Sequence, residues 1–344
     1  MTDPLFKLGT FKVGGARVAG LVLDQSVIDI ARSLVHFNAS ARAQGRALAH
    51  ADSVLGLLDD WERNFDALQA LAEFALAEGA GQGGLADATH ALASLTVLPP
   101  VLRPSKMLYA AANYREHVKE MRASNFTGGD YDKAKDAHAQ KDRSKLRPYA
   151  FLKAPNCLSG AYDDIVLPSG VHNIDWEAEM AVVIGRAGRN IPAARAMDHV
   201  AGFMTTNDVS CRDLTWREDR PTIRSDWVAG KSFDTFAPTG PFLVPRAFVA
   251  DHANLAVKLW VNGVIKQDGN TSDMVFNTEE QIEYAAAMLT LEPGDLLATG
   301  TPSGVGQGRG EFLQAGDIVE TEVEGLGKQR NRVVAGSSAY QGGR

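Results

Sequence analysis

The stretch that decides the fold is residues 173–185, Asn-Ile-Asp-Trp-Glu-Ala-Glu-Met-Ala-Val-Val-Ile-Gly. Its second half, Met180–Ile184, is rich in β-branched residues and ends at a glycine, which predicts a strand. Residues two apart on a strand point to the same face, so the carboxylates of Glu177 and Glu179 are expected side by side. Such close like charges repel each other unless a cation lies between them. The pattern favours a divalent metal site over the alternative, a solvated edge strand with two exposed acids.

Asp208 is the best candidate for a third acidic ligand, because it follows the short apolar stretch Val200–Met204. Three carboxylates with no histidine or cysteine nearby form an all-oxygen set, which suits Mg²⁺, Mn²⁺ or Ca²⁺ better than zinc or copper. Three protein ligands leave the remaining octahedral positions open for water or for a chelating substrate. A structural ion is more often fully caged, so the pattern favours a catalytic ion.

The composition is that of a globular protein. The chain has 344 residues, enough for a large core and two domains. Its net charge of −7 argues against nucleic acid as a partner, and no apolar run reaches transmembrane length. The first residues lack the apolar segment of a signal peptide, and Cys157 and Cys211 are too few for a disulfide framework. We therefore expect a cytoplasmic protein with no nucleic-acid or membrane partner.

Two domains are predicted. A helix is expected from Asp60 onward, because large and small apolar residues recur there at helical spacing. The glycine cluster at 79–84 follows this helix and lacks Lys-Ser/Thr, which indicates a linker and not a phosphate loop. The proline-rich segment 99–104 then marks a boundary, so residues 1–98 form a small N-terminal domain and residues 99–344 the catalytic domain.

A histidine and a glutamate just after the boundary form a candidate acid–base pair. His117 and Glu120 are three residues apart, so on a helix they share one face. A carboxylate beside an imidazole fixes its tautomer and raises its basicity, as a general base requires. The alternative is an ordinary surface ion pair.

Residues 122–148 are polar, contain Gly128-Gly129 and carry many charges, Arg143 among them. Their position directly after His117 and Glu120 predicts a lid that closes over substrate. The alternative is a surface insertion without a function.

Two later segments add polar groups to the candidate site. Lys231 lies in Gly-Lys-Ser-Phe-Asp, and a lysine near three carboxylates and a dication would stabilise a developing oxyanion. The segment 294–306 ends an apolar strand in a glycine-rich loop, whose backbone N–H groups and Thr301 hydroxyl could approach an anion closely. The absence of Gly-Lys-Ser/Thr in this loop argues against nucleotide binding.

Six motifs in order closely resemble the fumarylacetoacetate hydrolase family. They are Asn113-Tyr-Arg-Glu-His117-x-x-Glu120, Phe151-x-Lys-x-Pro155, Asp175-Trp-Glu-x-Glu179, Asn207-Asp208-x-Ser-x-Arg212-Asp, Gly230-Lys-Ser-Phe-Asp-x-Phe-x-Pro-x-Gly-Pro241 and Thr299-Gly-Thr-Pro-Ser-Gly-Val-Gly306. The resemblance covers roughly residues 100–335 and implies an α+β, β-rich fold, a mixed β-sandwich or roll with a small N-terminal α+β domain. It also implies a homodimer.

Residue by residue, the resemblance assigns the roles in the site. The implied ligands of Mg²⁺ or Mn²⁺, with Ca²⁺ as a further option, are Glu177, Glu179 and Asp208. The implied catalytic groups are His117 and Glu120, which activate water, and Lys231 beside the metal. Arg212 and Thr301 match positions that hold substrate oxygens, and Tyr114 and the lid residue Arg143 are further candidates for substrate binding.

These residues predict a metal-dependent hydrolase that cleaves the C–C bond of a 2,4-dioxo acid. An acylpyruvate such as fumarylpyruvate or maleylpyruvate, of the kind found in aromatic catabolism, would give pyruvate and a carboxylic acid. Isomerisation of a 2-hydroxymuconate-type acid, decarboxylation and hydration use the same enolate chemistry and stay open as alternatives. A third alternative is a family member that binds a keto acid without catalysis.

Overall fold

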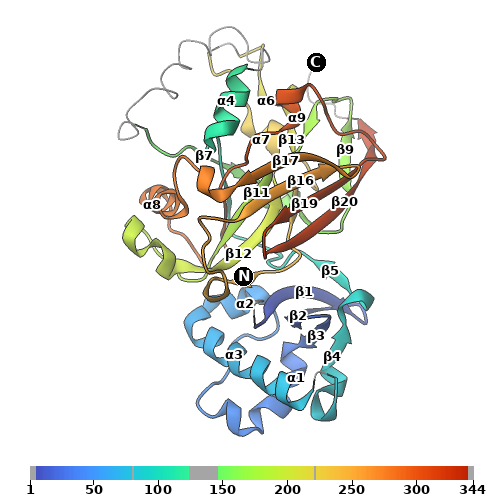
Figure 1. The fold of residues 1–344 in the computed structure, drawn as a ribbon, viewed down its shortest axis with the longest axis vertical. Coiled ribbons are helices and arrows are strands. Elements are labelled where there is room, and N and C mark those ends of the chain that lie inside the picture. The colour runs from blue at the N-terminus through green and yellow to red at the C-terminus, as the bar shows by residue number, and fades with distance from the viewer. Residues whose placement is uncertain (1–4, 80, 124–145, 221, 340–344) are drawn as a thin grey trace.

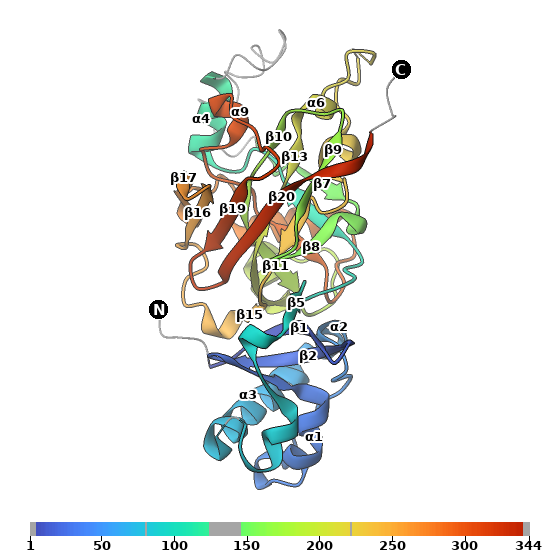
Figure 2. The same ribbon diagram turned by 90° about the vertical axis from the view of Figure 1, so that its right-hand side faces the viewer.

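The computed structural model describes residues 5–79, 81–123, 146–220 and 222–339. The N-terminal part forms a five-stranded sheet in the order β4-β3-β2-β1-β5, with α1 and α3 on the side away from the rest of the chain (Figures 1 and 2). Its elements are β1 (Lys7–Val13), β2 (Ala16–Leu23), β3 (Ser26–Asp29), α1 (Ile30–Asn38), α2 (Val54–Asp59), α3 (Trp61–Glu78), β4 (Thr89–Ala91) and β5 (Thr96–Leu98).

Local sequence signals account for the elements of this part. Gly14 and Gly15, with φ of 55° and 88°, form the turn between β1 and β2, where a side chain would strain the backbone. The predicted helix after Asp60 is α3, which buries apolar residues such as Leu68, Leu71 and Ala75 and is capped by Gly79 with φ of 79°. The edge strand β5 ends at Leu98, next to the predicted domain boundary. Strand β1 contacts the larger part of the chain through a backbone bridge between Leu8 and Leu243.

The larger part contains two long sheets. The first has the order β7-β6-β18-β11-β12-β14-β8, with β15 also on β12, and the second has the order β17-β16-β19-β20-β9. The strands are β6 (Met107–Ala110), β7 (Ala150–Lys153), β8 (Leu158–Gly160), β9 (Ile165–Ser169), β10 (Ile174–Asp175), β11 (Ala178–Ile184), β12 (Val200–Asn207), β13 (Ser210–Cys211), β14 (Ala237–Thr239), β15 (Val244–Pro245), β16 (Ala256–Val261), β17 (Val264–Asn270), β18 (Leu296–Ala298), β19 (Ile318–Val323) and β20 (Gly327–Ala339).

The two sheets pack face to face. Every residue of β11 and β12 is buried, whereas β16 and β19 alternate between buried and half-buried residues. β11 and β12 therefore lie in the interior, and β16 and β19 cover them with one face. This arrangement confirms the predicted α+β, β-rich fold with a β-sandwich.

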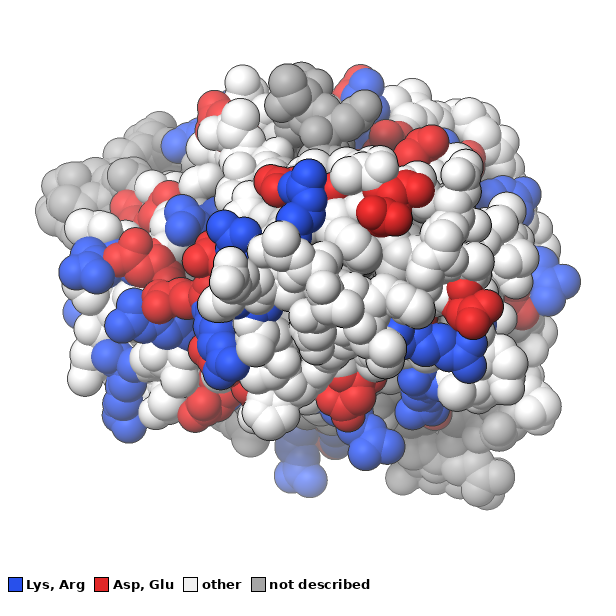
Figure 3. Space-filling model, turned by 90° about the horizontal axis from the view of Figure 1, so that it is seen from below, with Lys and Arg blue, Asp and Glu red and all other residues white. Residues whose placement is uncertain are grey.

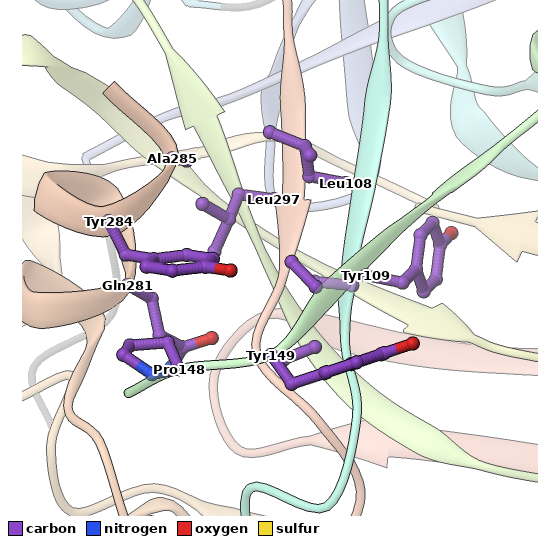
Figure 4. A pocket seen from close by; sticks show the side chains of 11 residues that line it. Leu108, Tyr109, Pro148, Tyr149, Gln281, Tyr284, Ala285 and Leu297 are labelled. Atoms are coloured by element: carbon purple, nitrogen blue, oxygen red, sulfur yellow. The ribbon is translucent and has the colours of Figure 1, made fainter. Parts of the chain in front are cut away.

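Helix α8 (Thr278–Met288) packs against the first sheet near β6 and β18. Figure 4 shows Tyr284 on this helix and Leu108 and Leu297 on the two strands, around a small cavity. The cavity has a volume of about 10 Å³, which is room for about one water molecule. It is too small to bind a substrate.

The hairpin between β16 and β17 turns at Asn262 and Gly263, with φ of 53° and 76°. Positive φ at both residues defines a type I′ turn, as the Asn-Gly pair predicts.

The remaining short helices gather at the end of the sheets farthest from the N-terminal part (Figures 1 and 2). They are α4 (Arg115–Ala123), α6 (Arg212–Thr215), α7 (Trp227–Lys231) and α9 (Gly306–Arg309). The predicted lid, residues 122–148, falls mostly outside the described residues, because 124–145 are not described, and Arg143 lies there. The structure therefore does not test the lid.

Two observations bear on large partners. No helix in the described part of the chain is long and apolar enough to span a membrane. On the face of the N-terminal part seen in Figure 3, acidic and basic side chains are mixed around a neutral centre. That face therefore lacks the one-signed basic surface that nucleic acid requires.

Candidate active site

The three predicted metal ligands come together at the adjoining ends of β11 and β12. Glu179 lies within β11 and Glu177 just before it, while Asp208 directly follows β12. The antiparallel register pairs Ala178 with Asn207, and the Asp208 N–H donates to the Glu177 carbonyl at 2.8 Å. One carboxylate oxygen of each acid consequently lies within 4.8 Å of those of the other two, and all three residues are buried.

Two lysines contact this cluster from within the protein. The Lys231 ammonium donates to Glu177 Oε2 at 2.8 Å and to Asp208 Oδ2 at 2.7 Å. Burial lowers the pKa of Lys231, but the negative charges of Asp208 and Glu177 outweigh it and raise the pKa, so the amine stays charged. Lys153 donates to the other oxygen of Asp208, Oδ1, at 2.6 Å.

Glu177 is held ionised by its neighbours. Burial raises the pKa of this carboxyl, yet the charges of Lys231, Arg212 and His117 together bring the pKa well below its usual range. Arg212 donates from its guanidinium to Glu177 Oε1 at 2.5 Å.

Glu179 is the acid without a cationic hydrogen-bond partner among the described residues. Its Oε2 accepts the Gly300 N–H at 2.8 Å, and its buried Oε1 has no partner in the described part of the chain. Burial, and then the charges of Asp208 and Glu177, raise the pKa of Glu179 well above its usual range. A hard dication between these three oxygens would satisfy the free Oε1 and offset the repulsion. The site therefore fits a divalent metal ion, held by Glu177, Glu179 and Asp208.

His117 and Glu120 lie together on α4, as their spacing predicts. His117 Nδ1 is 3.4 Å from Glu120 Oε2, and both oxygens of Glu120 accept the Gly304 N–H, at 2.9 and 3.0 Å. His117 is buried, with 8% of its surface exposed. This is not the surface ion pair of the alternative interpretation. It is a partly buried pair that is held by the same glycine-rich loop as Glu179, through the N–H groups of Gly304 and Gly300.

Two of the predicted substrate-binding residues, Arg212 and Thr301, contact the metal-ligand residues or their backbone and bind protein groups. Arg212 Nε donates to Asp175 Oδ2 at 2.9 Å, besides its contact with Glu177. The Thr301 hydroxyl donates to the Ala178 carbonyl at 2.9 Å and accepts from Gln267 at 2.8 Å. Both side chains thus hold other residues of the site in place. Their contacts with substrate stay predictions.

Tyr114 directly precedes α4 and is fully buried. Burial, and after it the charge of Glu179, raise the pKa of this phenol. Its role toward substrate likewise stays a prediction.

Lys153 and Asp175 also belong to the site, although no role was predicted for either residue from its sequence motif. Lys153 stands in an otherwise apolar strand, β7, and an isolated lysine in such a strand is the signal that points to a buried ion pair. Asp175 accepts N–H groups from Gly306 at 2.6 Å and Gln307 at 3.0 Å, and so holds Arg212 in place. The sequence signal for Asp175 is its position two residues before Glu177, because residues two apart in an extended segment point to the same side.

Replacing Lys153 by methionine is expected to destabilise the protein. The ammonium uses all its hydrogens, on Asp208 and on the carbonyls of Val209 at 3.1 Å and Phe236 at 2.6 Å. Its loss leaves a buried carboxylate short of a partner, which costs about 3–5 kcal/mol. Urea unfolding of Lys153→Met measures this cost, with Lys258→Met as the control, since the Lys258–Asp268 pair is exposed and 3.6 Å apart. Equal unfolding free energies for the two variants would contradict the prediction.

Comparison with known proteins identifies relatives of the chain. The family model described as fumarylacetoacetate (FAA) hydrolase C-terminal matches residues 106–334. The mitochondrial oxaloacetate tautomerases Fahd2a of Rattus norvegicus and FAHD2A of Homo sapiens are each 40% identical to the chain over 265 residues, which cover 74% of this chain and 77% of theirs.

Solved structures of similar proteins include two enzymes. Maleylpyruvate hydrolase from Sphingobium sp. SYK-6 has a TM-score of 0.67 and 28% identity, with 96% of this chain and 100% of that chain covered, and has been solved in complex with manganese(II) ion and pyruvate. The 5-carboxymethyl-2-hydroxymuconate delta-isomerase from Mycobacterium smegmatis has a TM-score of 0.58 and 33% identity, covering 73% and 86%. The family match spans well over half of the chain and includes the whole site, so the protein belongs to the fumarylacetoacetate hydrolase family of enzymes.

Proposed function

We propose that the protein is a divalent-metal-dependent enzyme that acts on a 2-oxo acid, and that keto–enol tautomerisation of oxaloacetate is its first candidate reaction. The observation that carries the proposal is the buried cluster of Glu177, Glu179 and Asp208, together with the His117–Glu120 pair that the same glycine-rich loop holds. The choice of oxaloacetate is supported by the 40% identity to the two mammalian oxaloacetate tautomerases.

In this reaction a proton moves between C3 and the 2-oxygen of the substrate. Mg²⁺ or Mn²⁺, when bound, would supply Lewis-acid stabilisation of the enolate. His117 would take the proton from C3 and deliver it to the 2-oxygen, or carry it the other way in the reverse reaction, and Glu120 would hold the imidazole in one orientation and balance its charge. The Lys231 ammonium, fixed by Glu177 and Asp208, would stabilise negative charge that develops on oxygen.

Hydrolysis of an acylpyruvate, such as fumarylpyruvate or maleylpyruvate, is the second candidate. The same His117–Glu120 pair could deprotonate a water that attacks the C4 carbonyl, after which C3–C4 breaks and C3 takes up a proton. The products would be pyruvate and a carboxylic acid. The similarity to maleylpyruvate hydrolase supports this candidate.

An assay with a small substrate panel tests the proposal. The decay of enol-oxaloacetate, acetylpyruvate, fumarylpyruvate and maleylpyruvate is followed by ultraviolet absorbance with Mg²⁺, with Mn²⁺ and with chelator. We expect metal-dependent acceleration for the enol of oxaloacetate without release of pyruvate. Pyruvate together with a second carboxylic acid would indicate hydrolysis of an acylpyruvate, and pyruvate from oxaloacetate would indicate decarboxylation. No acceleration for any substrate would favour a keto-acid-binding protein without catalysis.

The assembly and the location of the protein are part of the same proposal. A homodimer remains the expected state, which light scattering of the purified protein checks. The cytoplasm remains the expected location, although the names of the mammalian relatives give them a mitochondrial one.

A further inference from the structure

The glycine-rich loop after β18 binds anions, but these are carboxylates of the protein itself. Backbone N–H groups of the loop donate to Glu179 from Gly300, to Glu120 from Gly304, and to Asp175 from Gly306 and Gln307. One short loop thus holds a metal ligand, the partner of His117 and the partner of Arg212. The position of the acid–base pair depends on how this loop meets Glu120.

Gly304 holds its N–H in a fixed place. Its φ is 101°, and a Cβ there would lie 2.0 Å from the backbone carbonyl oxygen of Lys266. Both the backbone conformation and the missing side chain are therefore required for the loop to follow β17 so closely. The Gly304 N–H, which donates to both oxygens of Glu120, therefore cannot shift unless the whole loop moves.

Gly308 limits the other side of Glu120. A Cβ on Gly308 would lie 2.6 Å from both Cγ and Cδ of Glu120 and 2.7 Å from Oε1. Gly308 lies in α9 and is not among the residues with positive φ, so its backbone accepts an alanine. The atoms that such a Cβ would meet belong to the far end of one flexible side chain. In the described part of the chain, the three atoms nearest to such a Cβ all belong to Glu120.

Resting on the proposed function, in which His117 moves a proton, we propose that Gly308 is a positioning residue of the active site. The space that its missing side chain leaves is filled by the Glu120 carboxylate, which the Gly304 N–H holds there and which in turn orients His117. A methyl group at residue 308 would move the carboxylate away from the imidazole without touching the metal ligands.

A displaced Glu120 carboxylate would have space to move into. A groove of about 270 Å³ lies beside Glu120. It is lined by Glu120, Ile265, Lys266, Asp268, Ser303, Gly304 and Arg309. Glu120 can swing toward this groove, so Gly308→Ala should fold normally. Alanine is also the better helix former at this position by about 1 kcal/mol.

The first test is kinetic and uses the full chain with Mn²⁺. We expect Gly308→Ala to lower kcat about tenfold or more, the scale on which an acid–base group contributes. The KM and the Mn²⁺ affinity, measured by calorimetry, should not change. In a Glu120→Ala background, Gly308→Ala should have no further effect, because the two changes act through the same group. Gly310→Asn is the control, since Gly310 has φ of 69° and nothing within 4 Å of its Cβ position.

The second test does not depend on turnover. The ring ¹H–¹⁵N signals of His117 should shift in Gly308→Ala in the same direction as in Glu120→Ala, because both remove the carboxylate from Nδ1. Wild-type His117 signals or wild-type kcat in Gly308→Ala would overturn the inference, as would an equal loss of kcat in the Glu120→Ala background. If His117→Ala keeps full activity, the proposed proton transfer fails and kcat no longer reports on residue 308. The shift of the His117 signals in Gly308→Ala then decides the positioning role by itself.

Discussion

Glu179→Gln is expected to weaken Mn²⁺ binding on the order of 100-fold while the fold is kept, because site affinity depends on the count of charged ligands. Glu179 is the acid whose Oε1 has no partner among the described residues and whose pKa is raised, first by burial and then by Asp208 and Glu177. An amide keeps the shape and the acceptor for the Gly300 N–H but removes the charge. Isothermal titration calorimetry with Mn²⁺ measures the change in affinity.

The metal-free stability of Glu179→Gln provides a separate check on the same idea. Removing a buried charge that repels its neighbours should leave the unfolding temperature of the metal-free protein unchanged or higher. The rise in unfolding temperature on adding Mn²⁺ should be lost, since only binding to the folded state produces it. Glu116→Gln is the control, because that carboxylate is exposed and paired with Lys119. Wild-type Mn²⁺ affinity in Glu179→Gln would remove this residue from the site.

The parts of the site that the sequence predicts are those that depend on local periodicity. The carboxylates of Glu177 and Glu179 lie within 4.8 Å of each other, as residues two apart on a strand should, although Glu177 lies just before β11. His117 and Glu120 meet because a helix brings residues three apart together. The Asn262–Gly263 turn is equally local. These features need no knowledge of which strands become neighbours.

The parts that the sequence does not predict depend on long-range contacts. Lys153 meets Asp208 across 55 residues, and the Gly304 N–H meets Glu120 across 184 residues. The glycine-rich loop suggests an anion site, but only the tertiary structure shows that its anions are side chains of the same chain. Arg212 is a similar case. Its sequence position is compatible with binding a substrate or another side chain, and only the tertiary structure shows that its guanidinium donates to Asp175.

His117→Ala is expected to lower kcat by about 10²–10⁴-fold, the range over which a positioned general base contributes. Mn²⁺ affinity should stay largely unchanged, because Nδ1 of His117 contacts Glu120 and not a metal ligand. Steady-state kinetics and calorimetry on the same preparation measure the two quantities. His252→Ala is a matched control, since His252 forms a similar pair with Glu279 at 3.1 Å but outside the site.

Exchange of the substrate C3 protons in D₂O then separates the two candidate reactions. If His117 acts only on water, His117→Ala loses hydrolysis but keeps C3 exchange, because chelation of a 2-oxo acid by itself acidifies those protons. If His117 acts on C3, as tautomerisation requires, exchange and turnover fall together. Equal loss of both would therefore favour oxaloacetate tautomerisation, and loss of hydrolysis alone would favour acylpyruvate cleavage. Wild-type turnover in His117→Ala would exclude this histidine from either mechanism.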